Sequence, residues 1–365
     1  MIRKKRYASS TDVARLAGVS QSAVSRTYKP GASVSNETRQ KVLAAAAELG
    51  YRPSMIPQIM LTHRSNLVAL VVGGMYNPFY AKTLERFTSG LQAAGHQVLL
   101  VHVDSGHTLD GAIPRLVSYR VDAIVSALAI LSPAAVDELS RLNIPIISFN
   151  TPVHNDWISS VCCDNVAAGR MAADLLVERQ GRSFAYVRGP LGSPASEERL
   201  QGFAERLGAK GFAAPRLSQG DFRYEGGLAA GLELLAGPER PDAIFCGNDL
   251  MALGLIDAAR ERLRLRVPED VMVVGFDDIP QASWEAYRLT TIAQDEAVMT
   301  DHALRIVTRA MELHSGAGNE RLVVPGKLIE RGSVRPGARA SDAPDGAPRR
   351  SVREEAREAA VKIPT

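Results

Sequence analysis

The sequence predicts two kinds of structure in one chain: a small all-α helix-turn-helix head, and an α/β body made of two doubly wound halves with parallel sheets. Three observations lead to this prediction. Residues 10–50 hold three short helical segments with capping residues at their ends. From residue 67 to residue 335, short apolar runs alternate with amphipathic segments. The net charge also changes sign between these two regions.

The composition is that of a globular protein with more than one domain. The 365 residues are 45% hydrophobic and 23% charged, which excludes a disordered or collagen-like chain. No apolar stretch reaches the roughly 18 residues of a membrane span, and no secretory signal follows the basic residues 1–6. The three cysteines, Cys162, Cys163 and Cys246, suit neither a disulfide framework nor a zinc site. We therefore expect a soluble, cytoplasmic protein whose cysteines belong to its core.

Charge is distributed unevenly along the chain. Residues 1–66 contain 11 Lys and Arg against 3 Asp and Glu, a net charge of +8, whereas residues 67–335 contain 26 against 32, a net charge of −6. A small basic head on a larger acidic body is typical of a head that binds a polyanion. Charge alone leaves open a solvated helical face on which lysines happen to lie.

Three helices are predicted in the head, over residues 11–17, 21–28 and 36–49. Their N-caps are expected to be Ser10 or Thr11, Ser20, and Ser35. Gly18 marks the first turn, Lys29-Pro30-Gly31 ends the second helix, and Gly50 follows the third. Nine apolar side chains fit one shared core: Val13, Ala14, Ala17, Val19, Val24, Val42, Leu43, Ala46 and Leu49.

The first two helices, joined across a glycine-bearing turn, predict a helix-turn-helix. The second helix keeps a polar outer face made of Gln21, Ser22, Ser25 and Arg26. A helix of this size fits the major groove of DNA, where polar side chains near its start reach base edges. Together with the basic charge, this face predicts a DNA-binding head.

The body alternates predicted strands with predicted helices. The strands are Leu67–Val72, Gln97–Val103, Ala123–Ser126, Pro145–Phe149, Ser183–Val187, Ala243–Cys246 and Val271–Phe276. Among the helices are Tyr80–Ala94, Val166–Gln180, Glu198–Lys210, Tyr224–Leu235 and Leu250–Arg262. Continuous apolar strands between helices indicate parallel sheets covered on both faces. Ligands of such sheets bind at the carboxyl ends of the strands, here in a cleft between the two halves.

Polar and aromatic side chains gather where these strands end. They include Asn77, Phe79, Asp104, Asn150, Asp164, Arg188, Asn248, Asp277 and Gln294. Amide, carboxylate and guanidinium groups next to aromatic rings suit hydrogen bonding to hydroxyls and stacking on the apolar face of a sugar. Some of them have structural alternatives, since Asp164 and Asp249 can cap helices and Asp277 can brace the turn after its strand.

The motif Asp12-Val13-Ala14-x-x-Ala17-Gly18-Val19-Ser20-x-x-x-Val24-Ser25-Arg26 resembles the lactose/galactose repressor (LacI/GalR) family of bacterial transcription regulators. The resemblance continues through Val34-Ser35-x-x-Thr38-Arg39-x-Lys41-Val42 and Leu49-Gly50-Tyr51-x-Pro53, and covers roughly residues 8–335. It implies base contacts from Gln21, Ser22 and Arg26, and phosphate contacts from Ser9, Ser20, Ser25, Thr38 and Tyr51. Thr11 and Met60 complete the implied DNA-binding set. For each serine, a helix cap or a solvated hydroxyl is the alternative.

Residues 54–66 join head and body. In the family this hinge folds into a short helix on DNA, and a leucine from it enters the minor groove. Here Met60 stands at the matching place and Pro57 replaces a more usual alanine. A methionine can fill a base step, though more flexibly than leucine. The alternative is a plain apolar linker.

The same resemblance implies an effector domain that looks like a periplasmic sugar-binding protein. It places the ligand among nine residues: Asn77, Phe79, Asn150, Arg188, Arg199, Phe222, Asn248, Asp277 and Gln294. Arg199 and Asn248 match motif positions that face the cleft in relatives. Arg188 and Arg199 together would tolerate a carboxylate or phosphate on the ligand, so the effector class stays open between sugar, sugar acid and related polyhydroxy compounds.

The sequence can be compared with three function classes: an enzyme, a pure ligand-binding module and a ligand-responsive DNA-binding regulator. An enzyme is expected to carry a group of catalytic or cofactor-binding residues, and the sequence contains none of the phosphate-loop, Gly-x-Ser-x-Gly, His-Glu-x-x-His and dinucleotide-binding patterns. A pure binding module would not need the head. We therefore expect a ligand-responsive regulator, most often a repressor in this family, with no catalytic residue, metal, cofactor or membrane partner. It would bind inverted-repeat operator DNA as a homodimer, at the nucleoid.

The predicted domains are residues 1–53 (DNA-binding), 54–66 (hinge), 67–335 (ligand-binding and dimerisation, two lobes) and 336–365 (tail). The tail lacks the leucine heptads of tetrameric relatives. We expect it to be disordered or weakly helical.

Overall fold

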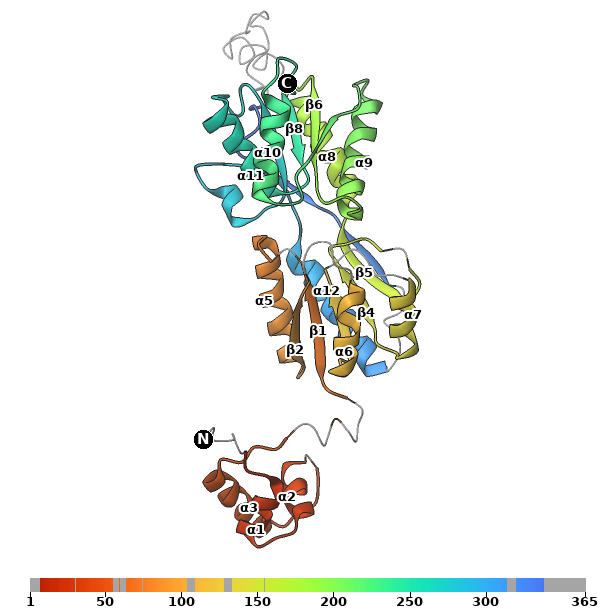
Figure 1. The fold of residues 1–365 in the computed structure, drawn as a ribbon, viewed down its shortest axis with the longest axis vertical. Coiled ribbons are helices and arrows are strands. Elements are labelled where there is room, and N and C mark those ends of the chain that lie inside the picture. The colour runs from red at the N-terminus through yellow and green to blue at the C-terminus, as the bar shows by residue number, and fades with distance from the viewer. Residues whose placement is uncertain are drawn as a thin grey trace, which may run out of the picture. The chain divides into compact units, whose positions relative to one another are not determined.

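The computed structural model describes residues 7–29, 31–54, 59, 64–73, 75–103, 109–127, 133–153, 155–313 and 320–337. It contains a three-helix head and a body of two compact units, each with its own sheet (Figure 1). The predicted fold class is confirmed. The first body unit holds the described residues within 64–76, 80–162 and 297–322, and the second those within 77–79, 163–296 and 323–337. Within these ranges no helix combines the length and the apolar character that crossing a membrane requires.

The head consists of α1 (Ser10–Ala17), α2 (Gln21–Tyr28) and α3 (Asn36–Leu49). The buried residues of its core are Val13, Ala14, Val24, Val42, Ala45 and Ala46, and the predicted core residues Ala17 and Val19 pack against them, as do Tyr28 and Tyr51. Leu43 and Leu49 are exposed by 41% and 37%, so placing them in the core was wrong. Val42, Ala45 and Ala46 follow the spacing of one helical face, and Leu43 points about 100° away from it.

The N-cap of α1 is Ser9, and the prediction of Ser10 or Thr11 was wrong. The Ser9 hydroxyl oxygen accepts a hydrogen bond from the Asp12 backbone N–H at 3.2 Å. The Asp12 carboxylate in turn accepts from the Ser9 backbone N–H at 3.0 Å. This reciprocal pair is a capping box, and it places the N-cap three residues before Asp12. Ser20 and Ser35 cap α2 and α3 as predicted.

The first body unit contains a six-stranded sheet in the order β11-β5-β4-β3-β1-β2. The strands are β1 (Leu67–Val72), β2 (Gln97–His102), β3 (Ala123–Ser126), β4 (Ile146–Phe149), β5 (Ile158–Cys163) and β11 (Arg321–Val324). Strands β1 to β5 pair in parallel. The helical segments are α5 (Pro78–Ala93), η1 (Leu109–Ala112), α6 (Ile113–Ser118), α7 (Pro133–Arg141) and α12 (Glu296–Leu313).

The second body unit contains a six-stranded sheet in the order β12-β10-β9-β8-β6-β7. The strands are β6 (Phe184–Arg188), β7 (Arg216–Gln219), β8 (Ala243–Cys246), β9 (Met272–Asp277), β10 (Thr290–Ala293) and β12 (Lys327–Ile329). All pairs among β6 to β10 are parallel, and β12 runs antiparallel to β10. The helical segments are α8 (Asn165–Glu178), α9 (Pro194–Ala209), α10 (Tyr224–Leu235), α11 (Asp249–Asp257), η2 (Ala258–Arg262) and η3 (Pro280–Ser283).

Helices α8 and α9 pack with almost no space between their backbones, which positions the start of α9. A Cβ added at Gly169 would lie 2.1 Å from the Arg199 carbonyl oxygen, and one at Gly202 would lie 2.0 Å from the Val166 carbonyl oxygen. Phe203 of α9 packs into an aromatic core with Tyr186, Phe245 and Phe276 of the sheet, and all four are fully buried.

Candidate functional site

Helix α2 presents the polar face that the sequence predicts. Gln21, Ser22, Ser25 and Arg26 are exposed, while Ala23, Val24 and Thr27 are buried against the head. The Gln21 amide donates to the Ser10 hydroxyl at 2.9 Å, and the Arg26 Nε donates to the Ser22 carbonyl at 3.3 Å. These partners lie on the head itself and are exposed, so a base edge can replace them at little cost.

The hydroxyl groups expected to contact phosphates lie mainly at helix starts. Ser9 and Ser20 are N-caps, Thr11 is exposed in the first turn of α1, and Thr38 lies in the first turn of α3. Backbone N–H groups at helix N-termini favour anions, so capping and phosphate binding are compatible there. Tyr51 packs edge-on against Tyr28, with ring centroids 5.9 Å apart. Met60 lies outside the described residues.

Eight of the nine predicted ligand residues belong to the second body unit: Asn77, Phe79, Arg188, Arg199, Phe222, Asn248, Asp277 and Gln294. Asn150 belongs to the first unit, where it follows β4, is buried, and donates its backbone N–H to the Val161 carbonyl at 2.8 Å. Asp104, another polar residue noted after a strand, lies outside the described residues.

Asp277, the last residue of β9, is held by two amide side chains. Asn77 Nδ2 donates to Asp277 Oδ2 at 3.0 Å, and Gln294 Nε2 donates to Asp277 Oδ1 at 2.8 Å. Burial raises the pKa of Asp277 above its ordinary value, and the charge of Arg199 and these two hydrogen bonds offset only part of this rise. Asp277 therefore organises the amides around it.

Arg199 is buried, with 3% of its surface exposed, and its guanidinium is fixed on three sides. Its Nε donates to Asn165 Oδ1 at 2.9 Å and its Nη1 donates to the Gly247 carbonyl at 2.6 Å. Its Cζ lies 3.5 Å from the centroid of the Phe276 ring, a cation–π contact. A guanidinium held this firmly presents its remaining N–H groups in one direction.

Asn248 is the N-cap of α11, and the alternative that assigned capping to Asp249 was wrong. Asn248 Oδ1 accepts from the Met251 backbone N–H at 3.0 Å, and Asn248 Nδ2 donates to the Phe222 carbonyl at 3.0 Å. Asp249 comes one residue too late to cap and instead points inward, where it accepts from Thr291 Oγ1 at 2.6 Å. Asp164, in contrast, caps α8 as predicted, accepting from the Ala167 N–H at 2.9 Å.

The aromatic members differ in exposure. Phe79 is 6% exposed, and its backbone N–H donates to Asn77 Oδ1 at 3.0 Å. Phe222 is partly exposed and has a φ of +60°, so its loop turns sharply just before α10. A partly exposed ring next to Asn248 can stack on an apolar ligand face.

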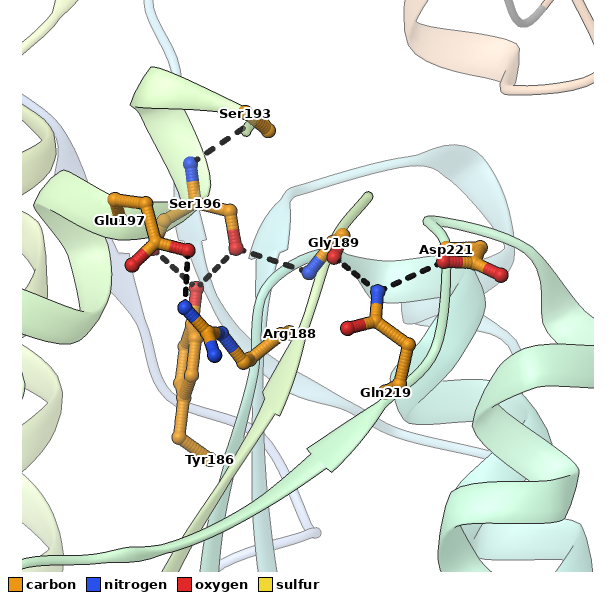
Figure 2. Close-up of polar contacts among 8 residues, drawn as sticks. All are labelled: Tyr186, Arg188, Gly189, Ser193, Ser196, Glu197, Gln219 and Asp221. Carbon is orange, nitrogen blue, oxygen red and sulfur yellow. Dashed lines mark hydrogen bonds and ion pairs between the residues drawn. The ribbon is translucent and has the colours of Figure 1, made fainter. Parts of the chain in front are cut away.

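Arg188 forms an ion pair with Glu197, which the sequence did not single out (Figure 2). Arg188 Nη2 lies 2.5 Å from Glu197 Oε1. Beside this pair, the Tyr186 hydroxyl donates to the Ser196 carbonyl at 3.0 Å, and the Gly189 N–H donates to Ser196 Oγ at 2.9 Å. The Gln219 amide bridges the Gly189 carbonyl and the Asp221 carboxylate. These contacts fix the strand end that carries Arg188.

Ser196 and Glu197 are candidate-site residues that the sequence did not indicate, and Asn165 was noted only as a residue that opens a helix. Asn165 and Glu197 each follow a serine or aspartate cap, which is the available signal in the sequence. Their contacts with Arg199 and Arg188 depend on how α8 and α9 pack. Among the residues that the structure describes, no cluster of three His, Cys, Asp or Glu side chains is suited to hold a metal. The three cysteines are buried, as predicted.

The head and part of the body each match the model of a known protein family. Residues 11–54 match the model of bacterial regulatory proteins of the lacI family, and residues 173–334 match a periplasmic binding protein-like domain. The chain is 35% identical over 308 residues to the HTH-type transcriptional regulator CelR of Thermobifida fusca, covering 81% of this chain and 89% of the relative.

Two solved structures have the same fold over most of the chain. One is the complex of the transcriptional regulator CelR with cellobiose, with a TM-score of 0.67, 32% identity, and coverage of 89% of this chain and 99% of that one. The other is the lac repressor dimer bound to operator and an anti-inducer, with a TM-score of 0.79, 25% identity, and coverage of 90% and 99%. This chain therefore belongs to the LacI family and is a DNA-binding transcriptional regulator, not an enzyme.

Proposed function

We propose that this regulator binds an inverted-repeat operator as a homodimer and represses genes of sugar or sugar-acid metabolism. Gln21, Ser22 and Arg26 would contact bases, and the hydroxyl groups at the helix starts, with Tyr51, would contact phosphates. The exposed face of α2 supports this assignment, and so does the lac repressor relative, which was solved as a dimer on its operator. Such binding takes place in the cytoplasm, at the nucleoid.

The effector would be a sugar or a related polyhydroxy compound bound at the carboxyl ends of β6, β8 and β9. The observation that carries this proposal is the buried Asp277 with its two amide partners, on which the charge of Arg199 also acts. The Phe222 ring lies against Gly189, the residue after β6, and the Phe222 carbonyl accepts from Asn248, two residues after β8. Fixed donors and acceptors next to an aromatic ring are what a hydroxyl-rich ligand requires. The relative CelR was solved with cellobiose.

Control of DNA binding would follow from linkage. A ligand that binds one conformation of the body more tightly than another shifts the population toward it by its difference in affinity. The residues proposed for the DNA-binding domain are 1–53, for the hinge 54–66, and for the effector domain 67–335.

Fluorescence anisotropy tests this proposal. Labelled duplexes from the upstream DNA of the chain's own gene are titrated with the full-length protein, with and without cellobiose, D-ribose and D-glucose. We expect salt-sensitive, sequence-specific binding that one sugar alters. If no duplex is bound more tightly than random DNA under any condition, the operator proposal is wrong. If a sugar binds by calorimetry without changing operator affinity, the proposed control is wrong.

A further inference from the structure

Two of the candidate ligand residues in the second unit, Arg188 and Arg199, carry a guanidinium group, and a carboxylate acts on the charge of each. Arg188 ends β6 and Glu197 lies in the first turn of α9, where they form the ion pair shown in Figure 2. Their side chains are 26% and 44% exposed, so a ligand can reach the pair, but the guanidinium already has an anionic partner. An incoming carboxylate would have to compete with Glu197 for Arg188.

The second guanidinium is balanced in a similar way. The positive charge of Arg199 acts on the buried Asp277, and two of its guanidinium N–H groups donate to Asn165 and to the Gly247 carbonyl. A carboxylate bound next to Arg199 would also be repelled by the like charge of the buried Asp277, and water screens such repulsion poorly in a buried place, which makes it costly. Arg188 is therefore paired with a carboxylate, and the charge of Arg199 is partly balanced by the buried Asp277, so neither guanidinium offers an unopposed positive charge.

Gln294 indicates what the ligand must supply. The residue is 8% exposed, and its Oε1 is buried without a hydrogen-bond partner. Its Nε2 donates to Asp277 Oδ1, which sets the orientation of the amide, because turning it over would place two oxygens together. A buried acceptor without a donor is destabilising, and a ligand hydroxyl can donate to it. Gln294 therefore favours a hydroxyl-rich ligand, and the choice between a neutral sugar and a sugar acid depends on the arginine–carboxylate arrangement.

Resting on the proposed function, we infer that the effector is an uncharged polyhydroxy compound and that Glu197 is the specificity-determining residue that excludes sugar acids by occupying Arg188. Loss of the Glu197 charge frees the Arg188 guanidinium, which then accepts a ligand carboxylate. The pair thus selects between two ligands that differ by one oxidised carbon.

Titration calorimetry on the full-length protein tests this inference with three matched pairs in which the acid keeps the sugar ring: cellobiose and cellobiouronate, D-glucose and D-glucuronate, D-galactose and D-galacturonate. We expect the wild type to bind the neutral member of one pair about 100-fold more tightly than the acid. Glu197→Gln should bind that acid about tenfold more tightly than the wild type does, with little change for the neutral sugar. The double variant Arg188→Gln/Glu197→Gln should lose this gain.

Glu205→Gln is the matched control. Glu205 lies on the same helix, is 48% exposed, and pairs with Arg170 at 3.1 Å, so its change should leave the preference for neutral sugars unaltered. A wild type that prefers an acid, or a Glu197→Gln variant that gains no acid binding with any pair, overturns the inference. Operator binding is measured separately, so a protein that discriminates neutral sugars from acids but ignores operator DNA contradicts the proposed function and leaves the inference supported.

Discussion

The aromatic ring of Phe222 lies against the backbone of Gly189. A Cβ added at Gly189 would stand 2.2 Å from Phe222 Cζ and 2.4 Å from Cε1, so only glycine leaves room for the ring. The backbone of Phe222 is fixed as well, because its carbonyl accepts the hydrogen bond from Asn248. Its φ of +60° is unfavourable for a phenylalanine, and these two contacts stabilise it.

Gly189→Ala should therefore weaken effector binding without unfolding the protein. The new methyl group would displace a partly exposed ring, which can swing toward solvent, and the stacking surface would be lost. We expect about a tenfold weaker affinity for the sugar that binds the wild type, equivalent to ~1.4 kcal/mol. Calorimetry measures this change. Gly237→Ala, where a Cβ meets nothing within 4 Å, is the control. An unchanged affinity in Gly189→Ala would show that Phe222 does not contact the ligand.

The close packing of α8 on α9 gives a second prediction. Gly202→Ala places a methyl group 2.0 Å from the Val166 carbonyl oxygen, so the two helices must separate. We expect a loss of roughly 1–3 kcal/mol in the free energy of unfolding, together with weaker sugar binding, because Arg199 lies on the displaced helix. Denaturant unfolding measures the first effect and calorimetry the second.

The control for this prediction lies on the same helix. Gly208 is in α9 and a Cβ there meets nothing within 4 Å, so Gly208→Ala should be neutral or stabilise by up to about 1 kcal/mol through helix propensity. Equal losses in both variants would mean that backbone conformation, and not helix packing, explains the effect at Gly202.

How much of this structure the sequence predicts depends on which interactions are local. Capping is local, so the N-caps of α2, α3 and α8 were predicted correctly, and that of α1 was missed by one or two residues. Apolar runs identified β1, β3 and β8. Strands β5, β7 and β10 were missed because serine, cysteine, threonine or exposed residues break the apolar pattern. In β10, Thr291 is buried and its hydroxyl bonds to Asp249, a partner 42 residues away that the sequence cannot indicate.

The same distinction applies to the candidate site. Strand ends located Arg188, Asn248 and Asp277, since the carboxyl edge of a parallel sheet follows from the strand order. Glu197 was missed because its role depends on α9 folding back toward β6. The sequence therefore predicts that Arg188 is available to an anionic ligand, whereas in the structure it forms an ion pair with Glu197. Local patterns predict where polar groups lie, and packing decides which of them remain available to a ligand.

DNA recognition by α2 gives a third prediction. Gln21→Ala should reduce affinity for the operator by about 5- to 150-fold, corresponding to roughly 1–3 kcal/mol for a bidentate base contact, and should leave binding to random DNA unchanged. The salt dependence should not change, because glutamine carries no charge. Gln40→Ala, on the exposed surface of α3 and outside the predicted set, is the control. If Gln21→Ala weakens specific and random binding equally, Gln21 contacts the DNA backbone only.

Asp249 gives the last prediction, on the pH dependence of stability. The carboxyl group is fully buried, and burial and the nearby Asp277 raise its pKa well above the ordinary value, although hydrogen bonds from Thr291 and the Ile279 N–H oppose this. Because the folded protein holds this proton more tightly than the unfolded chain, whose aspartates have a pKa of about 3.9, the stabilisation is complete below that value and is lost as pH rises through the folded pKa.

Asp249→Asn removes this titration and keeps an oxygen that can accept from Thr291. We therefore expect the free energy of unfolding of the wild type, relative to the variant, to fall as pH is raised from about 4 to about 8. Denaturant unfolding at several pH values measures this difference. Asp270→Asn serves as the contrasting control, because the Arg266 guanidinium lowers the pKa of Asp270. The difference in free energy of unfolding between the wild type and Asp270→Asn should change in the opposite sense. The wild type should lose stability relative to this variant only as pH falls below about 4. A difference at Asp249 that stays constant with pH would mean that its carboxyl group does not hold its proton in the folded state.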